Sequence, residues 1–580
     1  DLVRSRGLGD VYKRQLYEYV KEQDSEMYGR IKDRIAQNRW EAEGAMWVEP
    51  DCNLISGESM IRQIILGKQF FKQEFGVDSK VCWLPDVFGY SAALPQILKK
   101  AGVDTFVTSK ISWNEYNRMP HEIFRWHGID GSVVDAYFLT TQRKCKNVPT
   151  GNYSLYNGEG MPSEVEGTYA RLSDKDLTDE VLMPTGHGDG GGGTTPEMIE
   201  RINYLNRGIK GCNRSGFMKV EEFFSRLKRS LQGKTVPNWV GELYLEFHRG
   251  TYTSIAKNKR NNRLGEFSVW RGEWEGVLSE ILLQIPYPAD ALHESLKILL
   301  TNQFHDILPG SSIEAVYDET DREYGRMFGL LNKIEQDRLH AVADHVSRKG
   351  VCVFNPNSFE GGATVVWKGK TVGVNNVPSK GFAVFESSDL IVENTIYADK
   401  TRLESNLYRI IFNEDGKIVS FLDKRNGREI VKNGGLFNNI IAYENLPYEF
   451  DNWELKDYYS QKPFAVNDLI RAEVMEDGVR KGIKFTYKFY HSVIEQIVWL
   501  YENIERIDCE TKLDWHEHHF VLRSESETTI HSDSATYEIQ YGHISRPSHE
   551  NTSWDHAKFE VCAHKYIDVS EYGYGLSLLN

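Results

Sequence analysis

Between residues 16 and 240, short apolar runs alternate with segments of helical periodicity. Strands are expected at residues 45–48, 80–84, 105–108, 133–139 and 180–183, and helices at residues 58–71 and 92–100. Such alternation is typical of βαβ units that build a parallel sheet. We therefore expect an irregular, barrel-like parallel α/β domain, with functional side chains at the carboxyl ends of its strands.

The pattern changes twice further along the chain. Apolar residues at positions 292, 296, 299, 300, 304 and 307 follow helical spacing, and Pro309-Gly310 is expected to end that helix. A second charged helix is expected over residues 318–346, so residues 241–347 are predicted to form a three-helix bundle. From residue 348 to 580, short alternating runs separated by Gly, Asn and Asp predict a β-sandwich.

The composition narrows the range of partners. The formal net charge of −15 over 580 residues leaves no basic surplus to neutralise phosphates, so neither a nucleic acid nor a membrane partner is expected. Seven cysteines without a CxxC pair indicate free thiols in a reducing, cytoplasmic compartment. Residues 1–15 lack the apolar core of a signal peptide and are interpreted as a non-native tail.

The first candidate for chemistry is Asp86, which follows the apolar run at 80–84 and a proline. A carboxylate at this point would emerge at the open end of the sheet. The flanking Trp83, Phe88 and Tyr90 would provide aromatic walls that suit a sugar ring. The alternative is an N-cap for a helix starting near Ser91, and the spacing alone gives the two interpretations about equal weight.

The second candidate is the glycine-rich segment at residues 186–193, which contains His187 and Asp189. Consecutive glycines allow the backbone to pass close to a ligand. The Lys-Ser/Thr of a Walker loop is absent, and the strand–turn–helix context of a dinucleotide-binding fingerprint is lacking. A flexible surface loop is the remaining alternative.

Two further segments carry ionisable side chains. His305 lies beside the apolar stripe at the end of the expected helix, where a structural histidine is the more common interpretation. Alternation over residues 241–252 would place Glu242, Tyr244, Glu246 and His248 on one face of a strand. That face could bind sugar hydroxyls, or it could be a solvated edge.

Together these segments resemble glycoside hydrolase family 38, in the branch of cytosolic and vacuolar α-mannosidases and their bacterial relatives. The resemblance runs in the family's order from about residue 40 to 580. Its most specific strings are MWVEPDCN (46–53), WLPDVFGYSAALPQI (83–97), GHGDGGGG (186–193), GELYLEFHRGTYTS (241–254) and NQFHDILPGSSI (302–313).

The resemblance implies a retaining exo-α-mannosidase that holds one zinc ion with two His and two Asp residues. Asp86 matches the family's nucleophile, which is also a zinc ligand, and His305 matches the ligand from the helical domain. Asp189 is the expected acid/base, because its glycine-rich loop is the equivalent family segment. The expected substrate contacts are Trp47, His187, Glu246 and His248.

The other two zinc ligands of the family belong to a His-x-Asp pair on a first strand upstream of Asp86, and residues 1–85 of this sequence contain no such pair. We therefore expect a fragment truncated at both ends, with an α/β domain lacking its first strand, an incomplete β-sandwich, weak zinc binding and little activity. The expected partner is a mannose-containing oligosaccharide, and the chain could form a homo-oligomer. Two alternatives are a glycan-binding or inert product, and an enzyme resembling metal-dependent polysaccharide deacetylases.

Overall fold

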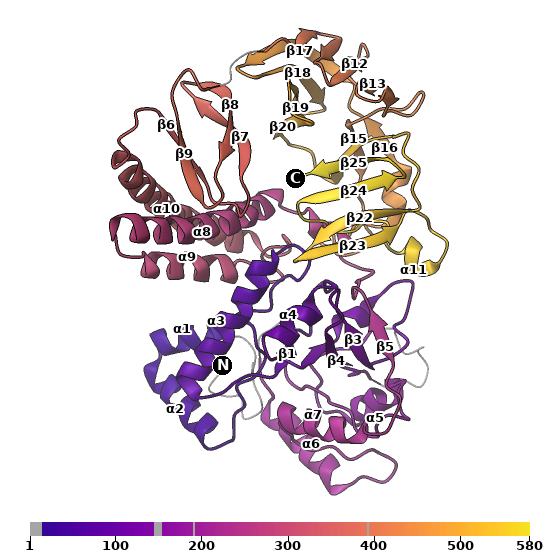
Figure 1. The fold of residues 1–580 in the computed structure, drawn as a ribbon. Helices are drawn as coiled ribbons and strands as arrows, with labels where there is room; N and C mark the ends of the chain where they lie inside the picture. Colours follow the sequence, from indigo (N-terminus) through magenta and orange to yellow (C-terminus); the bar gives the residue numbers. More distant parts are fainter. Residues whose placement is uncertain (1–13, 144–152, 189–191, 391–393) are drawn as a thin grey trace.

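A computed structural model describes residues 14–143, 153–188, 192–390 and 394–580 of the protein. The chain forms an N-terminal α/β part, a helical part and a large β-rich part, which follow one another in the sequence (Figure 1). The first helix, α1, begins at Arg14, inside the segment interpreted as a non-native tail. No helix in the described ranges is both long enough and apolar enough to cross a membrane.

A mixed five-stranded sheet forms the centre of the N-terminal part. Its order is β1-β2-β4-β3-β5, and only the β3–β4 pair is antiparallel. Its strands are β1 (Val81–Trp83), β2 (Thr105–Thr108), β3 (Ile123–His127), β4 (Val133–Phe138) and β5 (Asn238–Val240). The prediction of a parallel sheet is therefore wrong for β3, a strand that the sequence pattern did not indicate. Closure into a barrel is not confirmed, because the strand order ends at β1 and β5.

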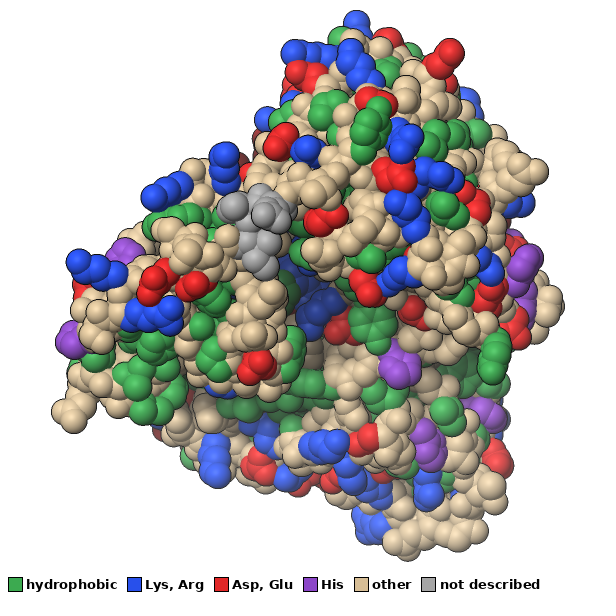
Figure 2. Space-filling view, turned by 45° about the horizontal axis from the view of Figure 1, so that its top comes forward, with side chains coloured by type: hydrophobic (Ala, Val, Ile, Leu, Met, Phe, Trp, Pro, Cys, Tyr) green, Lys and Arg blue, Asp and Glu red, His purple; other side chains and the backbone are tan. Residues whose placement is uncertain are grey.

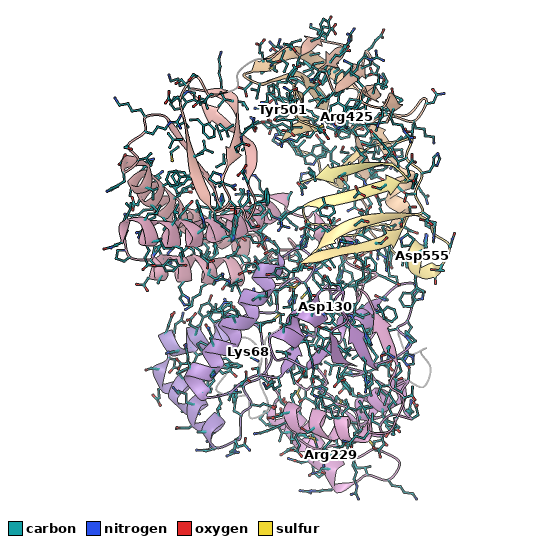
Figure 3. The ribbon with its side chains drawn as sticks, viewed as in Figure 1. Lys68, Asp130, Arg229, Arg425, Tyr501 and Asp555 are labelled. Atoms are coloured by element: carbon teal, nitrogen blue, oxygen red, sulfur yellow. The ribbon has the colours of Figure 1, made fainter. Side chains whose placement is uncertain are left out.

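Seven helices accompany this sheet within the described residues: α1 (Arg14–Gln23), α2 (Ser25–Ala36), α3 (Gly57–Phe75), α4 (Leu94–Lys100), α5 (Pro162–Arg171), α6 (Pro196–Arg207) and α7 (Val220–Ser230). Two labelled residues in Figure 3 show how they are attached. Lys68 on α3 donates to the carbonyls of Ser79 and Ala101, both at 3.0 Å. Asp130, in the β3–β4 turn, pairs with Lys100 of α4 at 2.8 Å.

Two expected strands do not form, each for a local reason. At residues 45–48 the backbone of Ala45 adopts a left-handed φ of 67°, and the Trp47 amide donates to Gln63 of α3. At residues 180–183 no strand ladder forms, and the Leu182 amide donates to the Tyr137 hydroxyl at 2.9 Å. Tertiary hydrogen bonds thus replace the expected sheet pairing.

The helical part contains α8 (Ala256–Leu283), α9 (Ala289–Thr301) and α10 (Glu314–Asp344), which share one buried apolar cluster. The expected helix at 292–307 ends at Thr301, before Pro309. The chain leaves the helix because it docks on residues 49–52: the His305 amide donates to the Glu49 carbonyl at 3.0 Å, and the Asp51 amide donates to the Gln303 carbonyl at 2.9 Å. His305 therefore lies on a turn.

The β-rich part begins with two antiparallel pairs, β6 (Val351–Asn355) with β9 (Gly381–Phe385) and β7 (Gly361–Trp367) with β8 (Lys370–Val377). The largest sheets are β10-β11-β12-β13-β14 and β17-β18-β19-β20. Their strands are β10 (Tyr397–Asp399), β11 (Arg402–Glu404), β12 (Tyr408–Phe412), β13 (Ile418–Asp423), β14 (Arg428–Glu429), β17 (Asp468–Asp477), β18 (Arg480–Phe489), β19 (Ser492–Tyr501) and β20 (Ile507–Asp514). One apolar cluster joins the two sheets, with residues such as Ile410 and Phe485.

The last two sheets have the orders β16-β15-β21 and β23-β22-β24-β25. Their elements are β15 (Asn439–Glu444), β16 (Pro463–Ala465), β21 (Phe520–Glu525), β22 (Ser534–Ile539), β23 (Gly542–Pro547), β24 (Tyr566–Glu571) and β25 (Tyr574–Leu579), with the short helix α11 at Ser553–His556. The four-stranded sheet contacts the N-terminal part, where Ile539 packs against Ala92 and Ala93. Figure 2 shows acidic and basic side chains interspersed over the visible face, and a hollow near its centre.

Candidate active site

Asp86 lies just beyond the carboxyl end of β1, as its sequence context predicted. The strand connection continues past Trp83, because the Leu84 amide donates to the Val107 carbonyl of β2 at 2.9 Å. Asp86 does not cap the next helix: α4 begins at Leu94, and its N-cap residue is Ala93. The helix-cap interpretation of Asp86 is therefore wrong, and its carboxylate is available for other contacts.

Three side chains surround the Asp86 carboxylate. The Lys110 ammonium lies 2.8 Å from Oδ1, whereas the Tyr156 hydroxyl lies 3.3 Å and His305 Nε2 lies 3.9 Å from Oδ2. Burial acts to raise the pKa of Asp86, but the neighbouring Lys110 and His305 outweigh it and hold the pKa below its usual value. Asp86 is therefore ionised at neutral pH.

His305 is buried beside Asp86 and is held in one orientation. Its Nδ1 lies 3.1 Å from the Glu49 carbonyl, and its ring packs edge-on against Phe88 at 5.9 Å between centroids. When Nδ1 donates to that carbonyl, Nε2 carries the lone pair and faces Asp86. This arrangement suits a metal ligand or an acceptor for a substrate hydroxyl.

A cavity of about 860 Å³ opens onto Asp86 and His305. The glycine-rich segment forms part of its wall, together with His187, whose side chain is exposed. The segment folds back on itself, since the amides of His187 and Gly192 each donate to the carbonyl of the other. Gly186 has a φ of 136°, which side-chain-bearing residues rarely adopt. The predicted acid/base, Asp189, lies outside the described residues.

Three other residues that were predicted to contact the substrate, Trp47, Glu246 and His248, do not line this cavity. Trp47 packs between α3 and α9, where its indole donates to Thr301 Oγ1 at 3.1 Å. The Glu246 carboxylate accepts the amides of Tyr116 and Asn117 at 2.9 and 2.8 Å, so it holds the loop at residues 114–117. Their roles as substrate contacts stay predictions, and their contacts in the structure are with the protein itself.

His248 lies behind Phe88, with 5.0 Å between ring centroids. Its Nδ1 lies 2.6 Å from Glu454 Oε1, on a loop of the β-rich part. Burial lowers the pKa of His248, although the hydrogen bond to Glu454 opposes that effect. The prediction that Glu242, Tyr244, Glu246 and His248 share one face of a strand is wrong. Residues 241–248 form no regular strand, and Glu242 pairs with Arg546 rather than facing the cavity.

The family resemblance implies a zinc ion held by two His and two Asp residues. Asp86 and His305 are brought together, as predicted. In the described ranges, however, no group of three or more His, Cys, Asp or Glu side chains is placed to hold a metal. A closed zinc site takes four ligands, and an open one takes three. The described residues therefore do not fit a complete zinc site.

Sequence reasoning missed Lys110, Tyr156 and Glu454. Lys110 follows the end of β2 by two residues, so the rule that located Asp86 at the end of β1 could have located it. Tyr156 and Glu454 carried no such signal. Glu454 lies more than 200 residues from His248 in the sequence, and only folding brings the two together.

Comparisons with known proteins agree with these features. Three family models match: the N-terminal domain of glycosyl hydrolases family 38 over residues 11–242, the α-mannosidase middle domain over residues 246–342, and the family 38 C-terminal domain over residues 403–580. The fold is similar to the crystal structure of an α-mannosidase from Enterococcus faecalis V583, with a TM-score of 0.80 and 13% identity. That match covers all of this chain and 76% of the other.

Curated relatives match over 98% of the chain. The human α-mannosidase 2C1 is 34% identical, and α-mannosidase G of Dictyostelium discoideum is 32% identical. The chain covers 55% and 57% of these proteins, so it spans about half the length of the curated relatives it matches. The order of the matched domains and the placement of Asp86 and His305 at one cavity lead to a single conclusion: the chain belongs to glycosyl hydrolase family 38.

Proposed function

We propose that the cavity at Asp86 binds a terminal α-linked mannose of an oligosaccharide and that Asp86 is the nucleophile of a retaining hydrolysis. The observation that carries this proposal is an ionised carboxylate at a strand end, opening onto a cavity of about 860 Å³. Pockets that bury a small ligand usually measure about 300–1,000 Å³, so a sugar ring with part of its aglycone fits.

In the proposed reaction, Asp86 Oδ2 forms a bond to the anomeric carbon while the bond from that carbon to the leaving oxygen breaks. A carboxylic acid protonates the leaving oxygen. Its carboxylate then removes a proton from water, which attacks the anomeric carbon and releases Asp86. Retention requires the two carboxyl groups to lie about 5–5.5 Å apart. Asp189 remains our proposal for the acid/base.

The number of zinc-binding side chains limits the hydrolytic activity that we propose for this chain. A zinc ion would supply Lewis acidity and orient sugar hydroxyls, but Asp86 and His305 are too few donors to hold one tightly. We propose that the chain hydrolyses aryl α-mannosides poorly even with added zinc. The same donor count favours a second candidate function, which is glycan binding without turnover.

A fluorinated mannosyl reagent that traps glycosyl-enzymes tests the nucleophile. We expect only a small fraction of the chain to be labelled, on the peptide containing Asp86, and no labelling of the Asp86→Asn variant. Mass spectrometry locates the label. A label on another residue would refute the assignment, and fast zinc-dependent turnover by the wild-type chain would refute the account of the donors.

The cysteine thiols give information about the cellular compartment of the protein. Among the cysteines of the described residues, the buried Cys52 and the half-buried Cys212 are free thiols. We propose a cytoplasmic location on this basis, since free thiols persist where the surroundings are reducing. A redox-sensitive tag fused to the chain would report the compartment in a host cell.

A further inference from the structure

Lys110 is linked to Asp86 through the carbonyl group of Pro85, the residue before Asp86. It begins the short 3-10 helix η1 (Lys110–Trp113), directly after β2. Its amide donates to the Pro85 carbonyl at 3.0 Å, and the Ser109 amide donates to the same oxygen at 3.1 Å. These two hydrogen bonds therefore fix the position of the carboxyl end of β1, which carries Asp86, relative to the carboxyl end of β2, which carries Lys110.

The Lys110 side chain is buried, with 8% of its surface exposed. Its ammonium lies 4.6 Å from the ring centroid of Trp113 and 5.3 Å from that of Phe88. Aromatic faces attract a cation, most strongly where water is excluded. A buried ammonium is costly unless it is paired, and the partner here is Asp86 Oδ1 at 2.8 Å.

The two oxygens of Asp86 therefore have different surroundings. Oδ1 faces the Lys110 ammonium, whereas Oδ2 faces the Tyr156 hydroxyl and His305 Nε2. Tyr156 and His305 both line the cavity, but Lys110 does not. The ammonium thus approaches the carboxylate from behind, and Oδ2 is the oxygen presented to a ligand.

We propose that Lys110 is a positioning residue for Asp86: it fixes the orientation of the carboxylate, so that Oδ2 faces the ligand, and compensates its charge. This inference rests on the proposed role of Asp86. Compensation makes the floor of the cavity a neutral ion pair, which suits an uncharged sugar. It also disfavours a cationic ligand, because such a ligand has to compete with the resident ammonium for the same carboxylate.

The test compares two ligands by isothermal titration calorimetry at pH 7.5. Methyl α-mannoside is the neutral ligand, and a protonated iminosugar of mannose configuration is the cationic one. In Lys110→Met we expect the iminosugar to bind at least ten-fold tighter than in the wild type, with methyl α-mannoside changed less than three-fold. Lys110→Arg keeps the charge and is expected to behave like the wild type.

Lys68→Met is the matched control. Lys68 is also largely buried and pairs with a carboxylate, Asp78, at 2.9 Å, but Asp78, unlike Asp86, does not line the cavity. We expect its loss to change neither affinity. If Lys110→Met shifts both affinities equally, or shifts neither, or if Lys110→Arg behaves like Lys110→Met, the positioning role is refuted.

A second measurement separates this inference from the proposed function. If the wild type binds neither ligand, the proposed function fails, and thermal unfolding then tests the pair itself. Lys110→Met leaves the partly buried Asp86 carboxylate without its ammonium partner and should lower Tm, whereas Lys110→Met combined with Asp86→Asn should recover at least half of that loss. Additive losses in the double variant would overturn the inference.

Discussion

The cavity at Asp86 and the junction between the N-terminal and β-rich parts are built from the same kinds of residues. Both contain buried carboxylates next to cations. At the junction, Glu242 pairs with Arg546 at 2.6 Å and Lys558 at 3.3 Å, so both of its oxygens are bound by the protein. At the cavity, the described residues place a cation within 3 Å of Oδ1 of Asp86 but not of Oδ2.

The difference shows that burial and residue type do not identify a functional carboxylate. Glu246 is more deeply buried than Asp86, yet its oxygens are taken up by the loop at residues 114–117. What distinguishes Asp86 is an oxygen that faces an open cavity while the other is held in place.

The largest effect is expected from Glu242→Ala. The change leaves the buried Arg546 guanidinium without its carboxylate, which costs about 3–5 kcal/mol of unfolding free energy. Urea denaturation measures the loss. A variant with apolar residues at both positions should recover much of it, and sugar binding should be unchanged. A loss below about 1 kcal/mol would show that this pair does not stabilise the junction.

The next effect depends on pH and involves His564, which donates to the Asn53 carbonyl at 2.6 Å across the junction. Burial lowers the pKa of His564 to about 4. The unfolded chain, with a His pKa of about 6.5, binds a proton between pH 6.5 and 4 that the folded chain does not, so stability falls as pH falls through this window. The expected loss is about 3 kcal/mol.

Thermal unfolding of the wild type and His564→Gln between pH 7 and 4.5 isolates this contribution. The glutamine amide can still donate to Asn53 but does not titrate, so the variant should lose less stability on acidification. Parallel curves for the two proteins would show that His564 does not set the pH dependence of the junction.

A smaller effect is expected from Glu246→Gln. The amide nitrogen would face either the backbone amides of Tyr116 and Asn117 or the side-chain amide of Asn117, and a lost buried hydrogen bond of this kind costs about 1–3 kcal/mol. Affinity for methyl α-mannoside should change less than two-fold. A ten-fold loss of affinity at unchanged stability would instead support the prediction that Glu246 contacts the substrate.

The smallest effect on stability is expected from His187→Ala, because this side chain is exposed at the cavity. The unfolding free energy should change by no more than about 0.5 kcal/mol. Affinity for methyl α-mannoside should fall by about five-fold, the equivalent of one hydrogen bond. Trp47→Phe should show the reverse, with about 1 kcal/mol lost in stability and no loss of affinity.

Local patterns predicted many elements well. The strands at 105–108 and 133–138 lie where short apolar runs predict them, and α3 and α10 contain their expected ranges almost entirely. The failures share one cause. At residues 45–48, 180–183 and 241–248 the backbone or the side chains bond to partners distant in the sequence, and local periodicity carries no information about such partners.

Residues close together in the chain were enough to indicate the family, the order of its domains, and the placement of Asp86 at a strand end. They also indicated His305, although on the wrong element. Which of the ionisable side chains remain available for a ligand depends on contacts that form only when the chain folds. Glu242 and His248 bond to partners across the junction and Glu246 bonds to the loop at residues 114–117, whereas Asp86 is held from behind by Lys110 with Oδ2 toward the cavity. The physical reason is that the donors and acceptors that pair with these side chains are distant in the sequence, so the hydrogen bonds form only when the chain folds.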